Sequence, residues 1–178
     1  ESLDGVIGQD HFFKNDKERL EAIAAYLALC SFVDAEIGIV LDAIKDNNFE
    51  DTTRIIYTSD HGDNMGARGL WGKSVLYEES TRIPMIVSGP DVPRGQVSKT
   101  PVTLLDVHQT AIAGLGQATH EADTDLFGKS LFEMASNKND PGRLVASEYH
   151  AMGAPSSAFM LRQGDWKYHY YEGFAPEL

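Results

Sequence analysis

The sequence has 178 residues, of which 42% are hydrophobic and 24% are charged, and its formal net charge is −12. This length and composition are typical of one globular domain, or of a piece of a larger one, with enough apolar residues for a core. The negative charge disfavours nucleic acid and anionic membrane surfaces as partners, because no diffuse positive potential would attract them. A small anionic substrate is compatible with it, since one lysine and one metal ion can reverse the potential inside a cleft.

The sequence shows little sign of disulfide bonds or membrane-spanning segments. Cys30 is the only cysteine in the sequence, so an internal disulfide cannot form. No uninterrupted apolar run reaches the roughly 18 residues that span a bilayer, and we expect no membrane partner. The sequence begins at Glu1 rather than at methionine, so we expect that an upstream segment has been removed. The cytoplasm and the periplasm both remain open as compartments.

Helix and strand patterns alternate in the first part of the sequence. After an expected loop over 1–15, apolar residues recur at spacings of three and four and predict a long helix. Asp16 is its expected N-cap and Asn47-Asn48 its expected end. Strands are predicted over 54–58 and 83–88, with a glycine- and aspartate-rich loop over 59–72 and a short helix over 73–80 between them. This order of elements is typical of parallel α/β units.

The rest of the sequence predicts a helix over 103–114, a loop over 117–140 and strands over 143–149, 158–162 and 166–171. Gln163-Gly164-Asp165 would join the last two strands as a tight hairpin. We therefore expect an α/β fold with a sheet flanked by helices, followed by a small antiparallel C-terminal sheet. The expected domain organisation is an α/β part over 1–116 and a connecting loop with a small sheet over 117–178.

An acid and an imidazole follow the first predicted strand, at the position where open α/β sheets bind ligands. Asp60 and His61 carry two side-chain types that ligate metals, and Gly62 allows a sharp turn that would let both face one ion. The same three residues also form an ordinary turn in which the aspartate caps backbone amides. Lys73, in a glycine-flanked stretch close downstream, favours the functional interpretation.

The segment SDHGDNMGARGLWGKSVLYEESTRIPMIVSGP, residues 59–90, resembles the metal and lysine block of the sulfatases, within the alkaline-phosphatase-like superfamily. The resemblance implies that Asp60 and His61 are metal ligands and that Lys73 is a catalytic residue that contacts the sulfate. Calcium is the expected metal, with Mn²⁺ as the alternative because imidazole is an unusual ligand for calcium. Arg68 and His150 are further candidates for substrate binding.

The flanking segments extend this resemblance over most of the chain. YLALCSFVDAEIGIVLDAI, VTLLDVHQTAIAGLG and ASEYHAMGAPSSAFMLRQGDWKYHYYEG are similar to family segments, most closely to those of choline-sulfatase-like members. The other polar residues of the central block are assigned structural roles: Tyr77, Glu78, Glu79 and Arg82 as packing and salt-bridge residues, and Asp63 as a solvated loop acid. Leu70 and Trp71 are expected in the core.

One departure from the family pattern concerns the nucleophile. The family carries a cysteine or serine, converted to formylglycine, in a C-x-P-S-R or S-x-P-S-R segment, and this sequence has no such segment. Cys30 lies instead in LCSFV, inside the predicted helix. The sequence thus looks like the C-terminal part of a sulfatase, a metal-dependent sulfuric ester hydrolase, with formylglycine and the first metal-binding aspartates expected in an N-terminal part.

Three further expectations follow from this interpretation. The piece by itself should be inactive, its substrate class should be a small sulfate ester, and a homo-oligomer is compatible with the sequence. A phosphonate or phosphate monoester hydrolase of the same superfamily is the first alternative. A non-catalytic binding or subunit-contact module, in which the Asp60–His61 loop is only a turn, is the second.

Overall fold

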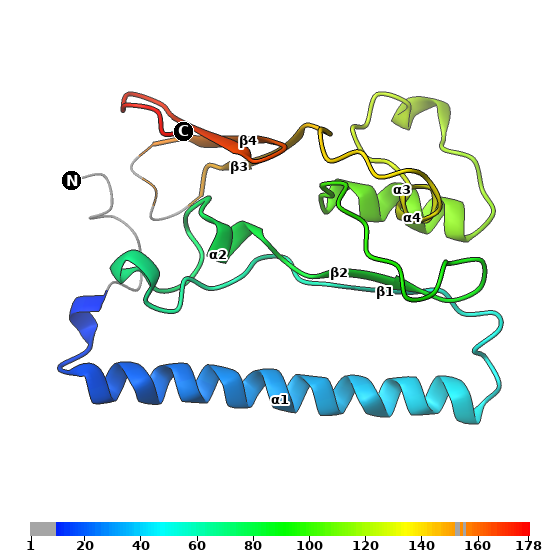
Figure 1. The fold of residues 1–178 in the computed structure, drawn as a ribbon, viewed down its shortest axis with the longest axis horizontal. Coiled ribbons are helices and arrows are strands. Elements are labelled where there is room, and N and C mark those ends of the chain that lie inside the picture. Colours follow the sequence, from blue (N-terminus) through cyan, green and yellow to red (C-terminus); the bar gives the residue numbers. More distant parts are fainter. Residues whose placement is uncertain (1–9, 152–153, 155) are drawn as a thin grey trace.

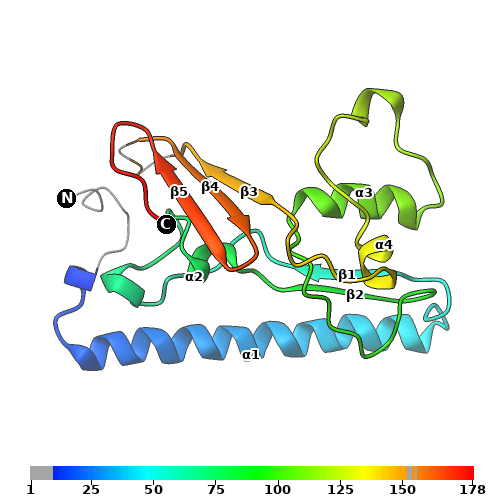
Figure 2. The same ribbon diagram turned by 45° about the horizontal axis from the view of Figure 1, so that its top comes forward.

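The computed structural model describes residues 10–151, 154 and 156–178. The β1–β2 pair runs alongside the long helix α1 (Figure 1). Helices α3 and α4 lie on the other side of this pair. A second sheet, β3–β4–β5, lies above the short helix α2 and is seen more nearly face-on in Figure 2. The helices are η1 (Asp10–Phe12), α1 (Asp16–Asp46), η2 (Ala67–Gly69), α2 (Glu78–Thr81), α3 (Leu105–Gly114), η3 (Glu121–Asp123) and α4 (Leu131–Ser136). The strands are β1 (Ile55–Thr58), β2 (Met85–Ser88), β3 (Val145–Tyr149), β4 (Ala158–Gln163) and β5 (Trp166–Tyr171).

Helix α1 confirms the predicted long helix, but apolar residues of the predicted pattern such as Leu20 and Val40 are exposed, and its N-cap is Asn15 and not Asp16. Asn15 has extended backbone angles, and its side chain accepts a hydrogen bond from the amide of Glu18. Asp16 is already helical and pairs with the guanidinium of Arg19. The helix ends at Asp46, with Asn47 as its C-cap, as predicted. Most of the expected opening loop falls on residues 1–9, outside the described residues.

Helix α1 is strongly apolar on average, although it has no uninterrupted run of 18 apolar residues. Only Asp34 and Glu36 are charged between residues 22 and 41, and the helix has an 18-residue window with a mean hydropathy of 1.8. By length and composition it could cross a membrane, which corrects the expectation that no segment could. The core helix of a soluble protein passes the same test. No residue of α1 is buried within the described part of the chain.

Strands β1 and β2 pair antiparallel, so the expected parallel arrangement is wrong for these two strands. Their register places Ile55 opposite Ser88 and Thr58 opposite Met85. A parallel pair needs a crossover connection, usually a helix of a dozen or more residues. The connection between β1 and β2 holds instead the polar loop and the four-residue helix α2, which begins only at Glu78. After this connection, the chain runs beside β1 in the opposite direction.

The C-terminal sheet confirms the predicted antiparallel end. Its order is β3–β4–β5, and the Gly164 turn joins β4 to β5 with a φ of 57°, a left-handed conformation that glycine adopts without strain. Ala158 and Met160 on β4 pack with Leu76, which comes from the loop that leads into α2. This small core fixes the sheet against the segment that carries the site.

Helices α3 and α4 form a third group, and a buried ion pair joins α3 to the segment between α4 and β3. Asp106 on α3 is completely buried and accepts two hydrogen bonds from the Arg143 guanidinium, at 2.7 and 2.8 Å. The backbone amides of Thr103 and Lys129 donate to the same carboxylate, each at 2.8 Å. The sequence predicted only loop over 117–140, because the six residues of α4 are too few to show a helical period.

Candidate functional site

The acid and the imidazole lie just beyond the last residue of β1, in the loop that their position predicted. Nε2 of His61 is 3.2 Å from Oδ2 of Asp60, and Nδ1 of His61 is 2.9 Å from the carbonyl oxygen of Gly62. Because a carbonyl can only accept, Nδ1 carries the proton of a neutral ring and Nε2 carries the lone pair. The lone pair of His61 and a carboxylate oxygen of Asp60 therefore face each other.

Lys73 approaches the same point from the other end of the loop. Its Nζ is 2.5 Å from Nε2 of His61. The structure thus brings together Asp60, His61 and Lys73, three groups that are separated by up to thirteen positions in the sequence. Asp60 is mostly exposed, with 78% of its side chain accessible, and His61 is about one-third exposed, at 37%. The group is open to a small molecule.

The electrostatics of this group keep the Asp60 carboxyl ionised. Partial desolvation acts to raise its pKa, but the hydrogen bond from the His61 backbone amide, at 3.0 Å, and the nearby Lys73 ammonium act against it. The net result is a pKa below the ordinary value for aspartate. An ionised carboxylate beside a fixed imidazole lone pair is a combination that metal ions bind.

Two residues that follow the acid–imidazole pair hold the loop in shape. Oδ1 of Asp63 accepts from the backbone amides of Met65, at 2.8 Å, and Gly72, at 3.2 Å. Asp63 therefore stabilises the loop by binding its backbone, and the expectation of a solvated loop acid is wrong. Asn64 is only 1% exposed, and its Nδ2 donates to the Gly72 carbonyl at 2.6 Å. An asparagine in a glycine-rich turn is the only local signal for this burial, and it is a weak one.

Gly62 is required by close packing rather than by its dihedral angles. A Cβ at this position would lie 2.0 Å from the carbonyl oxygen of Glu79. The loop after β1 therefore lies directly against α2, and the Gly62 amide donates to the Ser80 carbonyl at 2.8 Å. Any larger residue at position 62 would separate these two segments.

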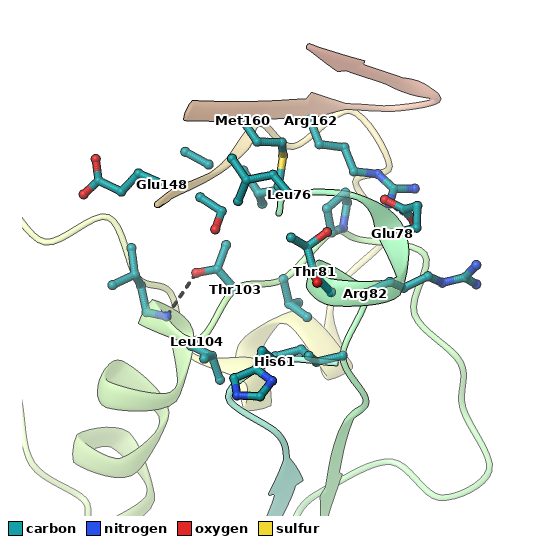
Figure 3. Close-up of a pocket in the computed structure, with 18 of the residues that line it drawn as sticks. His61, Leu76, Glu78, Thr81, Arg82, Thr103, Leu104, Glu148, Met160 and Arg162 are labelled. Carbon is teal, nitrogen blue, oxygen red and sulfur yellow. Dashed lines mark hydrogen bonds and ion pairs between the residues drawn. The ribbon is translucent and has the colours of Figure 1, made fainter. Parts of the chain in front are cut away.

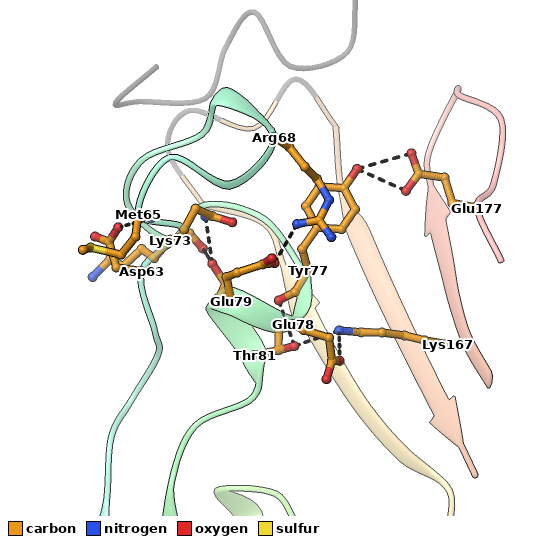
Figure 4. Close-up of polar contacts among 12 residues, drawn as sticks. Asp63, Met65, Arg68, Lys73, Tyr77, Glu78, Glu79, Thr81, Lys167 and Glu177 are labelled. Atoms are coloured by element: carbon orange, nitrogen blue, oxygen red, sulfur yellow. Dashed lines mark hydrogen bonds and ion pairs between the residues drawn. The ribbon is translucent and has the colours of Figure 1, made fainter. Parts of the chain in front are cut away.

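The structure places the two other candidate substrate-binding residues away from this group. Arg68, in η2, pairs with Glu79 at 2.7 Å and stacks over the ring of Tyr77, whose hydroxyl in turn donates to Glu177 at 3.3 Å (Figure 4). His150 pairs with Glu148 at 3.2 Å, just after β3. Neither residue lines the cavity next to the site.

A cavity of about 860 Å³ connects the site to the C-terminal sheet. His61 lies at one end of it, and Leu76 and Met160 lie toward the sheet (Figure 3). Glu78 marks its polar side, where it binds Lys167 at 2.7 Å and Arg162 at 3.1 Å. The expectation of a salt-bridge role for Glu78 is thus confirmed. The cavity offers a mostly apolar surface next to an end that holds the Asp60, His61 and Lys73 side chains.

As a metal site, the group supplies two ligands. The fixed tautomer of His61 and the facing carboxylate of Asp60 fit a divalent cation. Among residues 10–151, 154 and 156–178, no cluster of three or more His, Cys, Asp or Glu side chains could hold a metal. The described part of the chain therefore offers at most two of the side chains that a metal site would need.

Comparison with known proteins identifies the family. A family model described as Sulfatase matches residues 4–117, which is well over half of the chain. The chain belongs to the sulfatase family. The matched region includes all of α1, the candidate site and α3. The resemblance of residues 59–90 to the sulfatases is thus confirmed.

Individual relatives agree with this assignment. The choline-sulfatase of Rhizobium meliloti (strain 1021) is 34% identical over 148 residues, which cover 82% of this sulfatase chain and 28% of the relative. A solved structure described as a sulfatase from Bacteroides thetaiotaomicron matches with a TM-score of 0.80 at 25% identity, over 92% of this chain and 37% of that one. A phosphonate monoester hydrolase from Silicibacter pomeroyi matches with a TM-score of 0.81, also at 25% identity, over 92% and 35%.

These matches confirm the α/β fold of the sulfatases and their alkaline-phosphatase-like superfamily. They also show that the chain spans about a third or less of the length of the proteins it resembles. The activity and the substrate of the whole protein therefore remain to be proposed from the site.

Proposed function

We propose that this chain supplies part of the active site of a metal-dependent sulfuric ester hydrolase. Asp60 and His61 would be two of the metal ligands, and Lys73 would bind the sulfate group. The observation that carries the proposal is the convergence of the Asp60 carboxylate, the His61 lone pair and the Lys73 ammonium at one open point. Membership of the sulfatase family supports it.

The chemistry of ester cleavage explains why these groups belong together. Negative charge grows on the transferred group and on the leaving oxygen, so preorganised positive charge lowers the barrier. A divalent metal, Ca²⁺ or alternatively Mn²⁺, would supply Lewis acidity and charge neutralisation when bound. Lys73 adds a compact ammonium that can hold a sulfate oxygen, and Asp60 and His61 hold their donor atoms in fixed orientation.

Lys73 and a cation would compete for the same lone pair of His61. In the structure the ammonium lies 2.5 Å from Nε2, the atom that the proposal assigns to the metal. A histidine nitrogen has one lone pair, so it accepts from only one of the two partners at a time. Occupation by a cation would therefore leave the Lys73 ammonium free for an anionic substrate.

The formylglycine nucleophile belongs, on this proposal, to a part of the protein outside the given sequence. No C-x-P-S-R or S-x-P-S-R segment occurs in the 178 residues, and Cys30 lies on α1, where it is exposed. The isolated chain is accordingly expected to show no turnover. The similarity to a choline-sulfatase favours a small sulfate ester as the substrate class.

A phosphonate or phosphate monoester hydrolase is the second candidate. The observation that favours it is the similarity in structure to a phosphonate monoester hydrolase. The same lysine and metal would serve a phosphoryl or phosphonyl group, because both ester classes develop negative charge on oxygens of a tetrahedral centre.

The experiment that tests both candidates uses the natural full-length protein with an aryl sulfate and an aryl phosphonate, each assayed with added Ca²⁺ or Mn²⁺. We expect the sulfate ester to be the better substrate, and both Asp60→Ala and Lys73→Ala to lower its kcat/KM by roughly 10²–10³-fold. Calcium titration of the same variants should show weaker metal binding for Asp60→Ala alone. A full-length enzyme that keeps its turnover in both variants would contradict the proposal.

A further inference from the structure

A single buried residue, Ser80, contacts both halves of the candidate site. It is 3% exposed and lies in α2, the four-residue helix next to the site loop. Its backbone carbonyl accepts from the Gly62 amide at 2.8 Å, directly after the Asp60–His61 pair. Its hydroxyl donates to the backbone carbonyl of Lys73 at 3.1 Å. One residue thus holds the backbone next to the expected metal ligands and the backbone of the expected sulfate contact.

The shortness of α2 makes the Ser80 carbonyl available. The last carbonyls of a helix have no partner within the helix and must bind elsewhere. In α2 the Tyr77 carbonyl accepts from Ser80 and Thr81, and the Glu78 carbonyl accepts from Arg82. The next carbonyls face the loop, where Gly62 approaches so closely that a Cβ would not fit. Figure 4 shows Lys73 beside this helix, which also carries Glu79 and Thr81.

The neighbour Asn64 extends the connection. Its Nδ2 donates to the Ser80 hydroxyl at 3.2 Å and to the Gly72 carbonyl at 2.6 Å, one residue before Lys73. Because the Ser80 hydroxyl hydrogen points to the Lys73 carbonyl, its oxygen accepts from Asn64. Asn64 and Ser80, both buried, therefore hold the carbonyl groups on the two sides of the Lys73 Cα.

We propose that Ser80 is a positioning residue that sets the place of Lys73 relative to the Asp60–His61 pair. The inference rests on the proposed function, since it assigns the geometry of the same site. Its hydroxyl acts on the lysine half through the Lys73 carbonyl, and its main chain acts on the metal half through Gly62. Removal of the hydroxyl alone should displace Lys73 and leave the metal half in place.

The test is Ser80→Ala in the full-length protein, with kinetics on an aryl sulfate and calcium titration. We expect kcat to fall by about tenfold, because small misplacements of catalytic groups are costly. The calcium concentration that gives half-maximal activity should change by less than about twofold, since the backbone bond to Gly62 remains. In a Lys73→Ala background, Ser80→Ala should lower kcat by less than about twofold, because the group it positions is gone.

Ser130→Ala is the matched control. Ser130 is also buried, at 6% exposed, but its hydroxyl has no hydrogen-bond partner among the described residues, and it does not line the cavity. It should leave kcat unchanged. Ser80→Cys retains a weak donor of similar size and should give a smaller loss than Ser80→Ala, with the same folded spectrum by circular dichroism.

Three results would overturn the inference: an unchanged kcat in Ser80→Ala, an equal loss in the Lys73→Ala background, or a loss no larger than that of Ser130→Ala. The single variants Asp60→Ala and Lys73→Ala in the same assay show whether the positioning role of Ser80 alone is wrong or the proposed function is wrong as well. If both lower kcat/KM by roughly 10²–10³-fold while Ser80→Ala leaves kcat unchanged, only the positioning role is wrong. If neither affects turnover, both proposals are wrong.

Discussion

The buried ion pair between Asp106 and Arg143 should be the most sensitive polar contact of the fold. Arg143→Ala removes two of the four hydrogen bonds to a carboxylate that is completely buried. It also removes the bond to the Pro101 carbonyl, at 2.9 Å. A hydrogen bond to a charged group contributes about 1.5–3 kcal/mol, and breaking a buried pair on one side costs about 3–5 kcal/mol. We expect a loss of about 4 kcal/mol in the free energy of unfolding, because the Asp106 carboxylate keeps only two backbone amides.

Urea unfolding at pH 7, followed by tryptophan fluorescence, measures this loss as a shift of the midpoint at constant slope. Lys17→Ala is the matched control. It breaks an ion pair of 3.7 Å with Glu21 whose side chains are 83% and 66% exposed, and it should change stability by less than about 0.5 kcal/mol. A loss below about 1 kcal/mol for Arg143→Ala, or one equal to that of Lys17→Ala, would refute the reasoning that the Asp106 carboxylate depends on this partner.

Three other substitutions test separate parts of the structure. Gly62→Ala should abolish calcium binding measured by calorimetry, because its Cβ would lie 2.0 Å from the Glu79 carbonyl oxygen; unchanged affinity would disprove the close approach. Leu76→Ala should lower the free energy of unfolding by about 3 kcal/mol, because a side chain only 4% exposed leaves a cavity against Met160; thermal unfolding checks this. Burial lowers the pKa of His169 below its ordinary value, so its neutral form contributes stability above about pH 6.5 that is lost as pH falls toward the folded-state pKa. His169→Gln should therefore show a weaker loss of stability between pH 7 and 5 than the wild type does, and parallel pH curves would contradict this.

Much of the site could be predicted from sequence because its residues occur in one continuous segment. Asp60, His61 and Lys73 all lie within residues 59–90, so the proximity of their side chains requires only one folded loop. The strands of the C-terminal sheet could also be predicted, since alternating apolar and polar residues and a Gly-Asp turn are local signals. The predicted strand over 166–171 has the observed bounds.

The remaining features depend on partners that are distant in sequence. Asp106 and Arg143 are 37 positions apart, and no local pattern shows that the two charges are buried together. Asn64 and Ser80 are polar residues in a glycine-rich loop and a short helix, where exposure is the ordinary expectation, yet both are buried. The direction of β2 relative to β1 was also missed, because residue periodicity shows that a strand exists and not which way it runs.

The loop that carries the candidate site contains a residue, Met65, in an unfavourable backbone conformation. Met65 has a φ of 49°, in the left-handed region that costs a residue with a side chain roughly 1 kcal/mol or more. Its amide bond to Asp63 needs no particular side chain. Position 65 is therefore a suitable position for thermostabilisation: asparagine or glycine adopts this conformation more readily and leaves the side chains of Asp60, His61 and Lys73 unaltered.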